Sequence, residues 1–375
     1  RSGLSGPGDL ARGCCSCARC CDARHAGPTS CGSLAGKDVH IAVAITGLGA
    51  HLGTLSIPST ATGYRQLVRW AVACGSIRAF GIEGTGSYGA GLSRALVSQG
   101  YRVIEVDRAN RRLRRQHGKS DTIDAEAAAR AVLAGEANTS PKSGDGNVEM
   151  IRHLKIARDT ALKARTQAMV TLKTLIVNAP QPLREAFIAV TGPMTLIRAL
   201  AALRPGPMTS TTASAKTALR MLARRWLTLA AEIRELDDAL ERLVRRQASA
   251  LMTAPGIAVG TIAEMLIVLG DNPGRIRSEA AFAKLCGVCP IPASSGKTTR
   301  HRLNRGGNRR ANAALHRVAV VRMRSHPETK AYVHRRTAEG KSLREIRRCL
   351  KRYIAREIFN SLCRPTAQSA VSDGP

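Results

Sequence analysis

The stretch Val39-His-Ile-Ala-Val-Ala-Ile45 decides the fold of the first part of the chain, because a run rich in β-branched residues is typical of a strand. A glycine-containing turn over residues 47–53 follows, and it leads into a second run, Gly53-Thr-Leu-Ser-Ile57. Two such runs joined by a turn predict a β-hairpin.

Helix and strand patterns alternate on the carboxyl side of this hairpin. Apolar spacing of three and four predicts helices over 62–73, 89–99 and 121–134, and short apolar runs predict strands over 78–83 and 101–106. We therefore expect an α/β domain, with a mixed sheet and helices on its faces. Residues 139–147 are rich in Pro, Gly, Ser and Asp and predict a linker.

The rest of the chain is predicted to be mainly helical. Long amphipathic helices are expected over 148–177 and 213–252, separated by a Pro- and Gly-containing stretch over 204–212. They fit an antiparallel pair or a coiled-coil dimer arm, although core packing alone explains the same apolar stripes. Residues 255–362 predict short helices with glycine turns and many basic residues.

The charge of the chain indicates its class of partner. Its 375 residues include 58 Lys and Arg against 27 Asp and Glu, a net charge of +31. Such a surplus favours nucleic acid, held through its phosphates. Aromatic residues at 3% argue against base stacking as the main binding mode. A GC-rich genome would enrich Arg without any functional reason, so both interpretations stay open.

The cysteine spacing and the length of the apolar runs argue against a zinc-binding protein and a membrane-spanning protein. Six of the eleven cysteines lie in residues 1–31, where Cys17-x-x-Cys20 forms half of a zinc site without a second pair, so zinc is disfavoured. Cys286-x-x-Cys289 is interpreted as core. The longest apolar runs, such as 41–45 and 265–269, fall short of the roughly 18 residues of a membrane span. With no signal segment, we expect a cytoplasmic protein that associates with the bacterial nucleoid when bound to DNA.

Three carboxylates are candidates for metal-dependent chemistry. Glu83 ends a predicted strand before a glycine-rich turn, where open α/β sheets place working groups, and Asp121 and Asp124 share one face of a helix start. Together they suit Mg²⁺, as a phosphodiester reaction requires. A solvated glutamate and two aspartates that cap a helix and offset its dipole explain the same residues.

Two basic segments and a serine loop complete the candidate site. Pro292-Ala-Ser-Ser295-Gly-Lys297 places a serine among cations that favour attack on phosphorus, although a phosphate-binding loop has the same composition. No Gly-x-x-x-x precedes Gly296, so ATP binding is disfavoured. Residues 255–263 resemble weakly a DNA-binding hairpin between helices. The candidate nucleic-acid-binding residues are Arg111, Arg112, Arg114, Arg115, Lys119, Lys297, Arg300, Arg302 and Arg305.

Three motifs in the same order resemble the DEDD transposases of the insertion-sequence-110 family. They are Gly81-Ile-Glu-Gly-Thr-Gly-Ser-Tyr-Gly89, Gly118-Lys-Ser-Asp-Thr-Ile-Asp124, and Cys286 to Lys297 continuing to Asn304-Arg-Gly-Gly-Asn308. The resemblance implies a RuvC-like, ribonuclease-H-type domain over 32–138, a helical coiled-coil region over 148–250 and a transposase domain over 251–363. Residues 1–31 and 364–375 are expected to be disordered tails.

The resemblance also implies an activity and its residues. Glu83, Asp121 and Asp124 correspond to three of four acidic ligands of Mg²⁺, and Ser295 to the nucleophile, with Ser294 as a stand-in. The implied function is DNA strand cleavage and exchange for an insertion sequence, in which Ser295 forms a 5′-phosphoserine link. The implied partners are the DNA ends and target, an element-encoded structured guide RNA, and a second or further copies of the chain in a homodimer or homotetramer.

One departure from the family pattern affects activity. Leu34 stands where the family has its first aspartate, and leucine cannot ligate a hard cation. Asp38 is the candidate substitute. The first 31 residues are interpreted as the product of a frameshift or a misassigned start. The alternative function is therefore a decayed relic that binds nucleic acid without cutting it. A general basic DNA-binding protein is disfavoured, since it gives no reason for the carboxylate and serine motifs.

Overall fold

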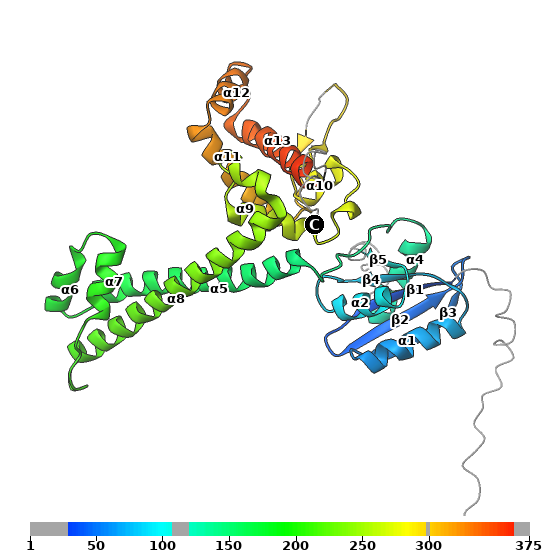
Figure 1. Cartoon of the computed structure of the whole chain (residues 1–375), viewed down its shortest axis with the longest axis horizontal. Helices are drawn as coiled ribbons and strands as arrows, with labels where there is room; N and C mark the ends of the chain where they lie inside the picture. The colour runs from blue at the N-terminus through cyan, green and yellow to red at the C-terminus, as the bar shows by residue number, and fades with distance from the viewer. Residues whose placement is uncertain (1–28, 107–119, 298–300, 364–375) are drawn as a thin grey trace, which may run out of the picture. The chain divides into compact units, whose positions relative to one another are not determined.

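The computed structural model describes residues 29–106, 120–297 and 301–363. The chain divides into two compact units at Lys142 and Ser143, and each is described by itself. Figure 1 labels most of their helices and strands. Arg111, Arg112, Arg114, Arg115, Lys119 and Arg300 lie outside the described residues, as does most of the predicted amino-terminal tail.

A five-stranded sheet in the order β3-β2-β1-β4-β5 forms the centre of the first unit. Strands β3, β2 and β1 pair antiparallel, and β1, β4 and β5 pair parallel, which confirms the predicted mixed α/β architecture. The strands are β1 (Thr29–Ala35), β2 (Val39–Ile45), β3 (His51–Pro58), β4 (Ile77–Glu83) and β5 (Val103–Val106).

Helices cover both faces of this sheet. On one face α1 (Ala61–Ala73) and α2 (Ala90–Ser98) bury Leu67 and Leu92 against Phe80. On the other face α4 (Asp121–Leu133) packs on residues that alternate with these along the strands, including Val43 and Ala79. The period of two along each strand gives each face its own apolar set.

The expected boundary of the amino-terminal tail at residue 31 is corrected by strand β1. This strand begins at Thr29, so Thr29, Ser30 and Cys31 belong to the sheet, and Cys31 is buried in the core. Burial raises the pKa of the Cys31 thiol, with Cys74 adding to the effect. The sequence Thr-Ser-Cys-Gly-Ser-Leu-Ala lacks a β-branched run, and pairing with β2 and β4 on its two sides makes it a strand.

The second unit begins with two long helices that pack on each other. Helices α5 (Asn147–Val177) and α8 (Thr211–Ala248) run antiparallel, since Val148 packs near Val244 and Leu172 packs near Leu219. Figure 1 shows them side by side, with α6 (Gln181–Ile188) and α7 (Pro193–Ala201) at their far end. The sequence patterns did not predict α6 or α7.

A helical subdomain follows α8. Its core includes α9 (Val259–Leu269), which is apolar on nearly every side, and the carboxylate of Asp271 caps α5 through the amides of Val148 (2.7 Å) and Glu149 (3.2 Å). The remaining elements are η2 (Ser249–Thr253), η3 (Pro273–Arg275), α10 (Glu279–Leu285), β6 (Ile291–Pro292), β7 (His301–Arg302), α11 (Arg309–Ser325), α12 (Pro327–Ala338) and α13 (Leu343–Cys363). Helix α13 has 21 residues and α11 has 17, longer than the short helices expected here.

No helix among the described residues is long and apolar enough to cross a membrane.

Candidate functional site

Glu83 lies at the carboxyl edge of the parallel part of the sheet. It is the last residue of β4, and its neighbours across the sheet are Leu34 on β1 and Val106 on β5. Its side chain is half-buried. The fold therefore places Glu83 where parallel strands bring functional groups to one edge, with a leucine at the neighbouring position of β1.

Helix α4 carries the two aspartates. Asp121, its first residue, is exposed, whereas Asp124 is only 4% exposed. The hydroxyl of Ser120 accepts a hydrogen bond from the amide of Ile123 (3.2 Å) and caps the helix. Since Ser120 supplies the cap, capping does not explain the two aspartates, and they remain at the positive end of the helix.

Two glycines let α4 approach the sheet closely. Gly32 on β1 and Gly81 on β4 are paired neighbours. A Cβ atom on Gly32 would lie 2.0 Å from the carbonyl oxygen of Ala125, and one on Gly81 would lie 2.6 Å from Val132. Any side chain at Gly32 would push the helix away, together with the Asp124 that it carries.

The predicted metal ligands are not gathered into one cluster in the described part of the chain. Among residues 29–106, 120–297 and 301–363, no three His, Cys, Asp or Glu side chains lie where they could hold a metal ion together. Glu83, Asp121 and Asp124 are therefore not assembled as a ligand set. Mg²⁺ needs several oxygen ligands in near-octahedral geometry, and these three carboxylates would supply only part of such a set.

Asp38, the candidate substitute for the missing carboxylate, does not form a ligand cluster with Glu83 among the described residues. It lies in the turn after β1, and its carbonyl oxygen accepts a hydrogen bond from the amide of Ser59, just beyond β3. Its backbone is thus held on the β3 side of β2, whereas Glu83 ends β4 on the other side of β1. Strands lie about 4.8 Å apart, so roughly 10 Å of sheet separates the two positions.

The predicted nucleophile lies in the second unit, on an exposed hairpin loop. Strands β6 and β7 pair antiparallel through Ile291 with Arg302 and Pro292 with His301. Ser294, Ser295 and Lys297 follow β6 in the loop that joins the two strands, and all three are exposed, as are Arg302 and Arg305. Gly296 adopts a φ of +54°, in the left-handed region that glycine tolerates best.

Asparagine side chains connect the segments that flank this hairpin. Asn312 donates to the carbonyl oxygens of Cys286 (3.2 Å) and Gly287 (2.8 Å), and Asn304 donates to that of Lys284 (3.0 Å). A Cβ atom on Gly307 would lie 2.2 Å from the amide nitrogen of Gly287, so the two backbones are in contact. The Asn304–Asn308 segment therefore connects the end of α10 to the start of α11 through hydrogen bonds and direct backbone contact.

Cys286 and Cys289 differ in their surroundings. Cys286 is buried, as expected for a core residue, and burial raises the pKa of its thiol to about 12. The interpretation as core was wrong for Cys289, which is partly exposed and lines a cavity. The turn around Gly256 has a φ of +70° and joins η2 to α9, with Ile257 and Ile262 buried beneath it.

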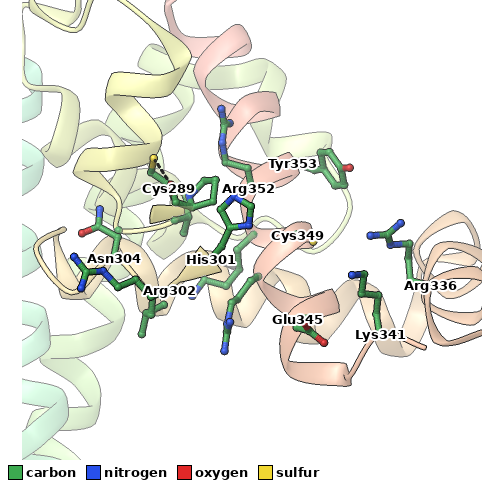
Figure 2. A pocket seen from close by; sticks show the side chains of 16 residues that line it. Cys289, His301, Arg302, Asn304, Arg336, Lys341, Glu345, Cys349, Arg352 and Tyr353 are labelled. Atoms are coloured by element: carbon green, nitrogen blue, oxygen red, sulfur yellow. Dashed lines mark hydrogen bonds between the residues drawn. The ribbon is translucent and has the colours of Figure 1, made fainter. Parts of the chain in front are cut away.

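A basic cavity beside the hairpin was not found from the sequence. It has a volume of about 560 Å³ and lies between the hairpin and helices α12 and α13 (Figure 2). Its cationic lining residues are Arg302, Arg336, Lys341, Arg348, Lys351 and Arg352. Of these, only Arg302 was predicted to bind nucleic acid. The i, i+3 and i+4 spacing of Arg348, Lys351 and Arg352 on one helix was the available signal.

Comparisons with known proteins match both parts of the chain. A model of DEDD-type IS110 transposases, described as "Transposase", matches residues 31–179, and a model of the "Transposase IS116/IS110/IS902 family" matches residues 248–334. The "uncharacterized 42 kDa protein" of insertion element IS900 from Mycobacterium paratuberculosis is 30% identical over 130 residues, which are 34% of this chain. The match covers 33% of that relative, about a third of its length. Since two separate models of one family together cover more than half of the chain, it belongs to the IS110 family of transposases.

Proposed function

We propose that this chain is a DNA transposase that cleaves and exchanges strands for an insertion sequence, with Ser295 as the nucleophile. The observation that carries the proposal is the exposed Ser295 loop. This loop follows β6 of the hairpin and lies in the part of the chain that the transposase model matches. Side-chain hydrogen bonds to the segment before the hairpin help to position it, and a positioned hydroxyl favours in-line attack.

In the proposed step, Ser295 Oγ attacks a phosphorus atom of the DNA backbone. A bond forms between Oγ and phosphorus, and the bond from phosphorus to the 3′ oxygen breaks. The serine proton is lost and the departing 3′ oxygen gains a proton, so the products are a 5′-phosphoserine and a free 3′-hydroxyl. Lys297 and Arg302, near the loop in sequence, would offset the charge that develops on the phosphate oxygens.

The nucleic-acid partners are proposed on the charge of the chain. A surplus of +31 suits a protein that holds both DNA and a structured, element-encoded guide RNA. The remaining predicted contacts are Arg305 and, outside the described residues, the basic run 107–119 and Arg300. Attachment to the bacterial nucleoid follows from the same DNA binding.

The domain assignments remain part of the proposal. We assign residues 32–138 to a RuvC-like, ribonuclease-H-type domain, because the strand order β3-β2-β1-β4-β5 suits that fold. Residues 148–250 would form a coiled-coil arm that joins copies into a homodimer or homotetramer, and 251–363 the serine-bearing domain. Mg²⁺ is the cofactor that the family implies, with Glu83, Asp121 and Asp124 as its proposed ligands.

A second candidate is a decayed relic that retains nucleic-acid binding. Two observations favour it: the position beside Glu83 on β1 is Leu34, and the described residues contain no group of three side chains able to hold a metal. A site that lacks one carboxylate binds a hard cation weakly, so strand cleavage would be lost before DNA binding.

One experiment separates the two candidates. Purified full-length chain is incubated with guide RNA, Mg²⁺ and labelled element-end DNA, and covalent protein–DNA adducts are resolved on a denaturing gel. The active candidate predicts an adduct that Ser295→Ala abolishes and the matched Ser294→Ala retains. The relic predicts no adduct with the parent chain and its appearance in Leu34→Asp. An adduct that persists in Ser295→Ala would refute the assignment of the nucleophile.

A further inference from the structure

The basic cavity beside the hairpin has an excess of positive charge that the protein does not neutralise. Glu345 is the one acidic residue of its lining. Two of the cations are paired with carboxylates outside the lining: Arg352 with Glu279, and Arg336 with Glu339 at 2.5 Å. Within the described part of the chain, four lining cations form no ion pair: Arg302, Lys341, Arg348 and Lys351.

Lys351 is the most informative of these four. It is only 8% exposed, and its ammonium donates a hydrogen bond of 2.6 Å to the amide oxygen of Asn312. Burial lowers the pKa of Lys351, and the nearby charge of Arg348 lowers it further. A buried ammonium with only a neutral acceptor is costly, so an anion in the cavity would stabilise it.

The hydrogen bond of Lys351 is linked through Asn312 to the residues that lead into the serine hairpin. Asn312, which accepts from Lys351, also donates to the carbonyl oxygens of Cys286 and Gly287. Gly287 begins the segment that lines the cavity and continues into β6. An anion held near Lys351 is therefore coupled through one asparagine side chain to the segment that leads to Ser295.

The size and lining of the cavity favour a nucleotide over a free ion. Its volume of about 560 Å³ is within the usual range for sites that hold organic ligands. Pro290, Leu303 and Tyr353 add apolar surface beside the cations. Figure 2 shows His301 of the hairpin near Cys349 and Arg352 of α13, with Arg302 beside Asn304 on one side and Tyr353 on the other. Apolar walls beside cations match a base and sugar beside a phosphate.

The cavity is also close to the proposed nucleophile. His301 lines it and pairs with Pro292, and Ser295 is three residues beyond Pro292. Three extended residues span at most about 10 Å. Adjacent phosphates of one B-DNA strand advance about 3.4 Å along the helix axis, so the cavity lies within roughly three nucleotides of Ser295.

We propose that this cavity binds one unpaired nucleotide of a nucleic-acid strand that passes Ser295, with its phosphate held by Arg302, Arg348 and Lys351. The inference rests on the proposed function for the identity of the passing strand. An unpaired nucleotide fits because a base inside a duplex cannot enter a concave site without leaving its stack. The site would hold the strand in register while the serine reacts.

Binding without chemistry tests the proposal. Full-length chain in EDTA is titrated into a labelled twelve-nucleotide single strand and into the matched duplex, and anisotropy gives both affinities. Arg348→Ala should weaken single-strand binding about tenfold or more, since charge-assisted phosphate contacts are strong. Arg344→Ala is the matched control, because it removes the same exposed charge from the same helix one turn away, outside the lining. It should change binding less than threefold.

Thiol protection supplies an independent readout. Cys349 lines the cavity, so the single strand should slow its alkylation at least fivefold without protecting Cys74 of the first unit. Single strands of DNA and of RNA are compared to identify which partner occupies the site. Equal losses in Arg348→Ala and Arg344→Ala, duplex binding reduced as much as single-strand binding, or unprotected Cys349 would each overturn the proposal.

The binding and adduct assays together distinguish a failure of the proposed function from a failure of the proposed nucleotide site. Ser295→Ala should bind the single strand as the parent does, because Ser295 is not in the cavity lining. An absent covalent adduct with intact, Arg348-dependent binding would count against the proposed function alone. An adduct that forms normally in Arg348→Ala, together with unchanged binding, would count against the cavity alone.

Discussion

Gly32→Ala should destabilise the first unit strongly, because α4 packs directly on the backbone of β1 at this residue. The added Cβ would lie 2.0 Å from the carbonyl oxygen of Ala125, 2.4 Å from the amide nitrogen of Ala129 and 2.9 Å from its methyl group. Ordinary contacts between such atoms are about 3.5–4.0 Å. The helix and strand would have to separate by roughly 1.5 Å.

The energetic cost follows from the kind of atoms involved. Overpacking a core usually costs about 1–3 kcal/mol, and flexible side chains absorb much of the clash where they can rotate. Here the two closest atoms belong to the main chain of a helix and cannot rotate away. We therefore expect about 3 kcal/mol or more, which corresponds to a fall of roughly 10 °C or more in the Tm of a domain of this size.

Calorimetry of the full chain, with hydrogen exchange of β1, β4 and α4 peptides, measures this effect. The matched control is Gly86→Ala in the turn after β4, where a Cβ meets no atom within 4 Å and φ lies outside the left-handed region. It should leave the Tm unchanged within about 2 °C. A Gly32→Ala protein as stable as Gly86→Ala would refute the close packing of α4 on β1.

Three further predictions concern the metal site, the second unit and pH. Leu34→Asp adds a carboxylate at the β1 position that is paired with Glu83, and it should tighten Mn²⁺ binding at least tenfold by calorimetric titration. Unchanged binding would count against a decayed ligand position. Asp271→Ala removes two hydrogen bonds to the start of α5 and should lower the free energy of unfolding in urea by about 1–2 kcal/mol. The control Asp145→Ala, at an exposed position before α5, should be close to neutral. Burial lowers the pKa of His40 below its ordinary 6.5. The contribution of neutral His40 to stability is therefore complete above that pH and is lost as the pH falls through the pKa of the folded state. His40→Gln should flatten the acid side of the plot of Tm against pH, and an unchanged plot would contradict this.

The regular elements with strong local patterns were predictable from the sequence. The β-branched run of β2 and the three-and-four spacing of α5 and α8 lie within a residue or two of their observed starts. Short or weakly patterned elements were not: α6 has 8 residues and α7 has 9, too few to display a clear period. Strand β1 contains Ser30 and Ser33, and serine is not typical of a core strand. Among the described residues their buried hydroxyls have no hydrogen-bond partner.

Some features of the candidate site could be predicted from the sequence, and others depend on tertiary contacts. The motifs around Glu83, Asp124 and Ser295 could be recognised from sequence, because each is a short continuous segment. The cap of α5 by Asp271, the pairing of Gly32 with Gly81 under α4, and the cavity between the hairpin and α13 join residues far apart in the chain. No local pattern encodes such contacts.

The sequence by itself determined the class of partner, the α/β and helical regions and the family of the chain, because charge, periodicity and motif spacing are local properties. Only the tertiary structure decided which residues meet. It placed Leu34 beside Glu83, held Asp38 away from that position and brought Arg302 together with Arg348 and Lys351. Strand order and helix packing set these distances, and both depend on burying apolar surface across the whole unit.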